Sequence, residues 1–117
     1  MNIEQYRDYC LAKKGVTESF PFDKDTLVFK VMGKMFALTS VESFDFINLK
    51  CDSEKAIELR EKYEAVKPGY HMNKSLWNSV YPNLDVADKI IYQWIDDSYN
   101  LIVLSLTKKL QAELESL

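Results

Sequence analysis

The sequence contains few of the residues that build linkers, staples and metal sites. It has three glycines, three prolines, two cysteines and one histidine among 117 residues. So little glycine and proline leaves no room for a flexible linker, and we expect residues 1–117 to form one domain with its own core. Cys10 and Cys51 lack the close spacing of a metal site. We therefore expect two free thiols, no metal and a cytoplasmic protein.

Long apolar runs are also absent. No apolar stretch reaches the length of a membrane span, and the run at residues 101–104 is broken by Ser105. The first residues lack the basic segment and apolar run of a secretory signal. We therefore expect no membrane association. A net charge of −3 argues against a broad basic surface.

Hydrophobic periodicity predicts an α+β fold in two layers, with helices packed on one face of an antiparallel sheet. Helical spacing predicts helices over residues 3–14, 54–63 and 87–102. Asn2 and Gln5 can cap the first helix reciprocally, and Asp85 is the expected cap of the last. Trp94 lies in the apolar stripe of that last helix and is expected in the core. Residues 106–117 are predicted to form a C-terminal helical extension.

Alternation of apolar and polar residues predicts the strands. The expected strands cover residues 27–32, 35–39, 44–49 and 76–81. Gly33 marks the tight turn between the first two, which makes them a hairpin. The pair Pro68-Gly69 predicts a turn before the last strand. Pro21 cannot donate to a central ladder, so residues 19–22 are predicted to lie at an edge.

The richest cluster of binding groups lies in residues 67–80. This segment holds the sole histidine and one of the two tryptophans, together with two lysines, two asparagines and no acid. His71 has no second histidine or nearby cysteine, so a role in holding the loop is favoured over metal binding or catalysis. Trp77 is either a core residue, which is favoured, or a stacking platform for a base. Lys34, Lys50 and Lys74 either lie on solvated strand edges or gather beside His71 to bind phosphate.

The chain resembles the MmcQ/YjbR family of small bacterial proteins. The resemblance is carried by FPF at 20–22, VFKVMGKMFA at 28–37, NLK at 48–50, PGYHMNK at 68–74, WN at 77–78 and SY at 98–99. It implies a CyaY-like (frataxin-type) fold and the DNA-binding role that is attached to this family. Frataxin relatives bind iron through a dense acidic ridge, whereas the first helix here offers only Glu4 and Asp8. We therefore do not expect an iron site.

Three functional hypotheses follow. The first is weak, largely electrostatic DNA binding through Lys34, Lys67, Tyr70, His71, Asn73, Lys74, Trp77 and Asn78. The second is a protein-interaction or adaptor domain without nucleic-acid or catalytic activity, which would use the exposed sheet face or the C-terminal tail. The third, a small-ligand pocket or enzyme, is the weakest because no nucleophile has a paired base and no cofactor motif is present. We expect a monomer with no catalytic residue and no cofactor.

Overall fold

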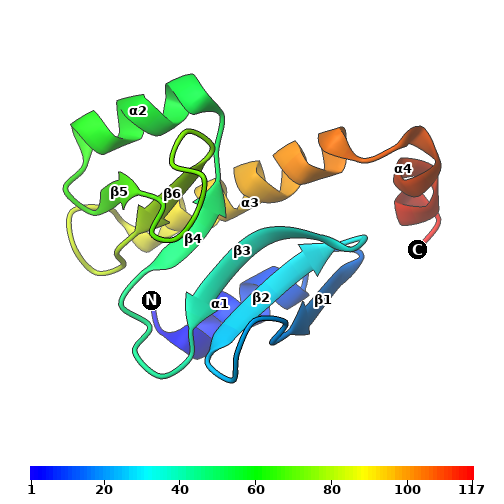
Figure 1. Cartoon of the computed structure of the whole chain (residues 1–117), viewed down its shortest axis with the longest axis horizontal. Coiled ribbons are helices and arrows are strands. Elements are labelled where there is room, and N and C mark those ends of the chain that lie inside the picture. The colour runs from blue at the N-terminus through cyan, green and yellow to red at the C-terminus, as the bar shows by residue number, and fades with distance from the viewer.

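An open antiparallel sheet with helices on one face forms the framework of the protein (Figure 1). The computed structural model describes residues 1–117. The elements are α1 (Ile3–Leu11), β1 (Val16–Ser19), β2 (Thr26–Val31), β3 (Lys34–Ser40), β4 (Ile47–Lys50), α2 (Ser53–Lys62), β5 (Val66–Pro68), β6 (Trp77–Val80), α3 (Asp88–Ser105) and α4 (Lys108–Glu115). The six strands lie in the order β1-β2-β3-β4-β6-β5, and every neighbouring pair is antiparallel. The predicted two-layer α+β fold is confirmed.

The main core lies between the sheet and the helices. Alternate residues of β2 and β4 point into it, and the buried stripe of α3 packs over them. The members of the stripe are Ile91, Trp94, Ile95, Ser98 and Ile102. The hydroxyl of Ser98 donates to the carbonyl of Phe36 at 2.6 Å and accepts from the amide of Lys50 at 2.9 Å. This buried serine therefore ties α3 to both β3 and β4.

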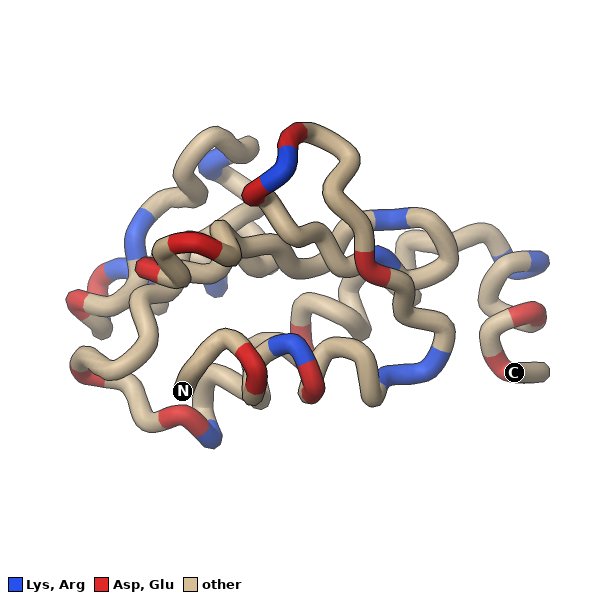
Figure 2. Tube along the Cα trace, turned by 90° about the horizontal axis from the view of Figure 1, so that it is seen from below, with Lys and Arg blue, Asp and Glu red and all other residues tan.

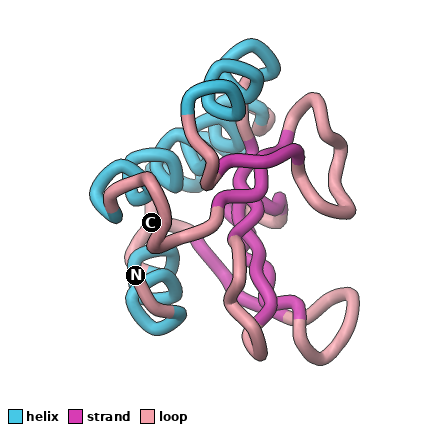
Figure 3. The backbone as a smooth tube through the Cα atoms, turned by 90° about the vertical axis from the view of Figure 1, so that its left-hand side faces the viewer, coloured by secondary structure: helices cyan, strands magenta, loops and turns pink.

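The opposite face of the sheet carries no helix. Figure 3 shows the helices on one side of the strands and loops projecting from the other side. A smaller apolar cluster of Val28, Leu38 and Trp77 lies apart from the main core, with Met35, Met72 and Leu76 packed against it. We call this helix-free side the open face.

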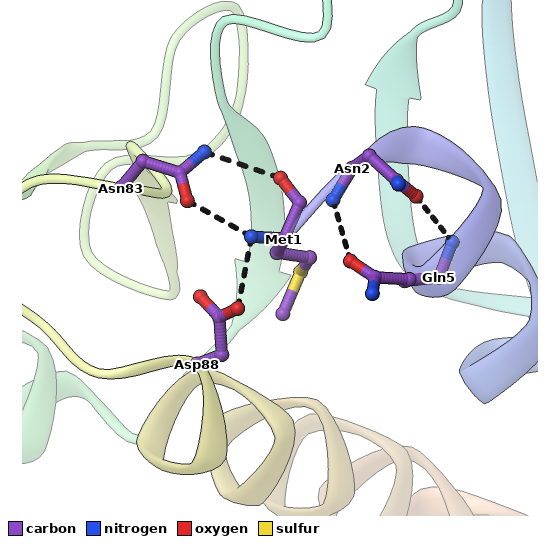
Figure 4. A network of polar contacts seen from close by, with 5 residues as sticks. All are labelled: Met1, Asn2, Gln5, Asn83 and Asp88. Atoms are coloured by element: carbon purple, nitrogen blue, oxygen red, sulfur yellow. Dashed lines mark hydrogen bonds and ion pairs between the residues drawn. The ribbon is translucent and has the colours of Figure 1, made fainter.

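The N-terminal residues connect α1 to the start of α3 (Figure 4). The amide of Gln5 donates to the side chain of Asn2 at 2.8 Å and the amide of Asn2 donates to Gln5 at 3.0 Å, so the predicted reciprocal cap is confirmed. The terminal amine of Met1 lies 2.8 Å from Asp88 and 2.9 Å from the side-chain oxygen of Asn83. These contacts fix α1 against the loop that precedes α3.

Several predicted boundaries are wrong. Asp85 does not cap α3, whose N-cap is Ala87; its carboxylate instead accepts from the amides of Glu64 and Ala65 at 2.8 and 2.9 Å. The third strand begins at Ile47 and not at Phe44, because Phe44 has a φ of +45° and lies in a turn.

Of the pair Pro68-Gly69 predicted to form a turn, Pro68 ends a short strand, β5, that was not predicted, and the turn follows at residues 69–72. Pro68 is tolerated there because β5 is an edge strand of the sheet. The first helix ends at Leu11, three residues before the predicted end.

The C-terminal residues form a separate helix. The chain turns at Leu106, and the hydroxyl of Thr107 then caps α4 by accepting from the amide of Leu110 at 3.2 Å. Leu114 is buried, and its side chain lies against Gly15 so closely that an added Cβ on Gly15 would be only 2.5 Å away. The predicted helical extension is therefore docked against the connection between α1 and β1, with Leu114 in the main core. None of the helices has both the length and the apolar composition that crossing a bilayer requires.

Candidate functional site

Three loops surround a hollow on the open face. They are residues 20–25 between β1 and β2, residues 41–46 between β3 and β4, and residues 69–76 between β5 and β6. Figure 3 shows loops projecting on this side. The hollow has a volume of about 690 Å³ and is lined by Phe22, Asp23, Asp25, Thr26, Met35, Leu38, Thr39, Ser40, Ser43, Phe46, Asn48, Tyr70, His71, Met72 and Asn73.

The formal charge of the hollow is negative. Asp23 and Asp25 line it together with His71, and no lysine or arginine is among the lining residues. The amides of Thr26 and Asp25 donate to Asp23 at 2.6 and 2.9 Å, and these hydrogen bonds hold the pKa of its carboxyl below the ordinary value. Asp25 accepts from the hydroxyl of Ser40 at 2.5 Å. Asp23 is therefore fixed by hydrogen bonds within its own segment, and Asp25 is fixed by Ser40 at the end of β3.

Aromatic rings form one wall of the hollow. The rings of Phe46 and Tyr70 meet edge to face at 5.8 Å, and the imidazole of His71 lies 4.0 Å from the Tyr70 ring. Tyr70 is 57% exposed and Phe22 is 64% exposed, which is unusual for such large side chains. His71 has a φ of +58°, a conformation that a residue with a Cβ adopts at an energetic cost. The fold therefore maintains a strained loop that presents aromatic rings to solvent.

A buried polar relay holds this loop against the sheet. The amide of Tyr70 donates to the hydroxyl of Ser79 at 2.9 Å, and that hydroxyl donates to the side-chain oxygen of Asn48 at 2.5 Å. The side-chain nitrogen of Asn48 returns a hydrogen bond to the carbonyl of Tyr70 at 3.2 Å. Both main-chain groups of Tyr70 are thereby satisfied. In the sequence, the signal for Asn48 is a polar residue between two apolar ones, Ile47 and Leu49.

An arginine from the helix layer holds the other end of the loop. Arg60 on α2 donates through Nε to Oδ1 of Asn78 at 2.7 Å, and through Nη2 to the carbonyls of Trp77, at 3.2 Å, and Lys74. The side-chain nitrogen of Asn78 donates to the backbone carbonyl of Ala56 at 3.3 Å. The sequence does not mark Arg60 as a functional residue, because its position on a charged helix resembles that of any solvated cation.

The residues predicted for the site fall into two groups. Tyr70, His71 and Asn73 line the hollow. Trp77 and Asn78 are only 6% and 2% exposed, so neither offers a free surface to a ligand.

The predicted lysines do not line the hollow. The amine of Lys74 turns back to the carbonyl of Gly69 at 3.0 Å. Lys34 lies 3.4 Å from the hydroxyl and the carbonyl of Ser105, at the end of α3, and Lys67 lies on the edge strand β5. The amine of Lys50 lies over the Trp77 ring at 5.4 Å. Figure 2 shows basic and acidic positions interspersed around the molecule.

These features define the class of protein. It is a small α+β domain that has helices on one face of its sheet and a hollow walled by loops on the open face. The family model YjbR matches residues 11–101, and the chain belongs to the YjbR family. It is 43% identical over 91 residues to the uncharacterized protein YbdF of Escherichia coli O157:H7, covering 77% of this chain and 75% of the relative. It is 35% identical over 104 residues to the uncharacterized protein YjbR of Escherichia coli strain K12, covering 88% of each chain.

A solved structure has the same fold. The crystal structure of a Deinococcus radiodurans protein with a DUF419 domain superimposes with a TM-score of 0.91 at 33% identity. The superposition covers 97% of this chain and 88% of the other. The likeness therefore includes α4 as well as the sheet.

Proposed function

We propose that this protein is a binding module that docks a cationic segment of another protein in the hollow on its open face. The observation that carries the proposal is the lining: exposed aromatic rings and two carboxylates, with no lysine or arginine. Such a surface repels phosphate groups and attracts a lysine or arginine side chain. We further propose that the protein acts as a monomer in the cytoplasm, where its two free cysteines stay reduced.

Aromatic faces and carboxylates recognise the same kind of group. A guanidinium or ammonium over an aromatic ring gains roughly 0.5–2 kcal/mol, and more in desolvated positions. Tyr70 and Phe46 offer ring faces and edges beside Asp25, while Leu38 and Met72 offer an apolar floor for the aliphatic stem of the cation. An arginine flanked by apolar residues fits this lining better than a polyanion does.

Peptide binding tests the proposal. We would measure the fluorescence anisotropy of labelled peptides that contain arginine and aliphatic residues, against matched peptides with glutamate in place of arginine. Arginine peptides should bind, and Tyr70→Ala should lower the affinity for them about tenfold, or about 1.4 kcal/mol. Leu84→Ala, which removes a similarly exposed side chain outside the hollow, should leave binding unchanged. Equal binding of the glutamate peptides, or no loss in Tyr70→Ala, would refute the proposal.

DNA binding is the second candidate. The observation that favours it is that Lys30 alternates with Val28 along β2 and so shares the open face with Lys50 and Trp77. Two or three phosphate contacts would give weak binding with a log–log salt slope of roughly −2 to −3. A titration of duplex DNA at low and moderate salt measures that slope. Binding that resists salt would contradict this candidate.

A further inference from the structure

A second cavity lies on the helix-covered side, between α2 and α3. Its lining comes from both helices and from β4 and β6. The cavity has a volume of about 270 Å³ and a mainly apolar lining. Its apolar residues are Leu49, Leu59, Val80, Trp94, Leu101 and Leu104. A dry cavity of about 150 Å³ already binds benzene, so this cavity can hold a phenyl or isobutyl group.

Opposite charges lie on the two walls of the mouth. Lys55 comes from α2, and Asp97 and Asn100 come from α3 one turn apart. Lys55 has only a loose contact with Glu58 at 4.0 Å, and no ion pair is formed by Asp97. Burial raises the pKa of the Asp97 carboxyl, the neighbouring Asp96 raises it further, and the charge of Lys55 across the mouth lowers it in part. A cationic ligand group beside Asp97 would relieve both effects.

The other charged residues at the mouth are already engaged. Asp52 caps α2 by accepting from the amide of Lys55 at 3.2 Å. Lys50 extends its amine over the Trp77 ring at 5.4 Å, and Trp77 packs in the open-face cluster. The charges left for a ligand are therefore one cation on α2 and one anion on α3.

We propose that this cavity binds a small zwitterion with an apolar body, namely an α-amino acid with an aromatic or branched side chain. The side chain would fill the space above Leu49 and Trp94. The carboxylate would face Lys55, and the ammonium would face Asp97 and the side-chain oxygen of Asn100. The cavity lies on the other side of the sheet from the hollow, so this site does not depend on the proposed function.

Cys51 provides a direct readout because its half-buried thiol lines the cavity, whereas Cys10 is fully buried. Burial raises the pKa of the Cys51 thiol to about 11, so alkylation by iodoacetamide is followed at alkaline pH, where the thiolate is populated. We would measure it on the native protein by intact mass spectrometry, adding L-phenylalanine or L-leucine at up to about 10 mM. Both amino acids should slow the modification of Cys51 several-fold. L-Alanine, which lacks the apolar body, should not. Absence of protection by L-phenylalanine and L-leucine, or equal protection by L-alanine, would overturn the proposal.

Ligand analogues and protein variants test the two charges separately. Phenethylamine lacks the carboxylate and 3-phenylpropionate lacks the ammonium, and each should protect about tenfold more weakly than L-phenylalanine. Asp97→Asn and Lys55→Gln should each weaken protection by L-phenylalanine to a similar extent. Glu61→Gln, which lies on α2 with Lys55 but outside the cavity, should leave that protection unchanged. Equal protection by all three ligands would refute the zwitterion assignment. The analogues need no substitution, so they decide the matter even if a variant fails to fold.

Discussion

Arg60 on α2 and Asn78 on β6 are joined by a hydrogen bond of 2.7 Å from Nε to Oδ1. Asn78 is 2% exposed and lies on the strand that follows the loop of residues 69–76. The same guanidinium reaches the carbonyls of Trp77 and Lys74. One side chain of the helix layer thus fixes the loop that forms the wall of the hollow on the other side of the sheet.

Removing this guanidinium should destabilise both the protein and the loop. Arg60→Ala leaves the buried Asn78 oxygen without its donor, so we expect the free energy of unfolding to fall by about 2–3 kcal/mol. Hydrogen exchange of the amides of Leu76 and Gly69 should also accelerate, since both belong to the loop's internal hydrogen bonds. Urea denaturation measures the first effect. Glu61→Ala on the same helix is the control and should change the free energy of unfolding little. An equally small change in Arg60→Ala would contradict the role of Arg60.

Gly69 should not tolerate a side chain. A Cβ at this position would lie 2.7 Å from Cβ of Trp77 and 2.9 Å from its carbonyl oxygen. Gly69→Ala should therefore cost about 1–3 kcal/mol and weaken peptide binding in the hollow. Gly33→Ala is the matched control: it meets no atom within 4 Å but has a φ of +88°, so it should cost about 1 kcal/mol and leave binding intact. Unchanged stability in Gly69→Ala would contradict the close packing described here.

Local signals were sufficient for the elements that depend on local chemistry. The reciprocal cap of Asn2 and Gln5, the hairpin at Gly33 and the burial of Trp94 in the α3 stripe were all predicted and are confirmed. Each of these features is set by residues close together in the sequence or by the helical spacing of one segment. Asp85 had the right residue type for a helix cap, but it binds the amides of Glu64 and Ala65 instead. No local rule distinguishes those two uses.

The site was predicted only in part, because it is made of segments distant in the sequence. The richness of residues 67–80 pointed to Tyr70, His71 and Asn73, which do line the hollow. The acidic side of the hollow comes from Asp23 and Asp25, which precede His71 by 48 and 46 residues in the sequence. Lys74 is exposed to solvent, and its amine also donates to the carbonyl of Gly69. Lys74→Glu would therefore remove this hydrogen bond as well as reverse the charge.

The packing of Trp94 should dominate the stability of the helix layer. Its side chain is 9% exposed and meets the Tyr63 ring edge to face at 5.4 Å. Trp94→Ala should lower the free energy of unfolding by about 3–5 kcal/mol, as measured by chemical denaturation. Leu104→Ala, on the same helix but 75% exposed, should change it by less than about 0.5 kcal/mol. Similar losses for the two variants would contradict the assigned core.

The loop of residues 20–25 should contribute to acid sensitivity through Asp23. Backbone hydrogen bonds from Thr26 and Asp25 hold the pKa of Asp23 below its ordinary value of 3.8. Its stabilising contribution is therefore complete above that value, and it is lost as the pH falls through the lower pKa of the folded state. Asp23→Ala should be less stable than the native protein at pH 7, and this deficit should shrink as the pH falls below about 4.

Urea midpoints at several pH values measure the deficit of Asp23→Ala. Lys24→Ala in the same loop is the control. A deficit that grows on acidification would contradict the assigned hydrogen bonds.

The most direct test of the open-face hollow as the functional site is a map of amide chemical shifts by nuclear magnetic resonance during titration with an arginine-containing peptide. We expect the shifted amides to cluster among the residues that line the hollow, at Thr26, Ser40, Tyr70, His71 and Met72. The chemical shifts of the amides near Lys34 and Lys67 should not change. Shifts confined to Lys34, Lys67 and their neighbours, with the loops of the hollow unchanged, would contradict the account.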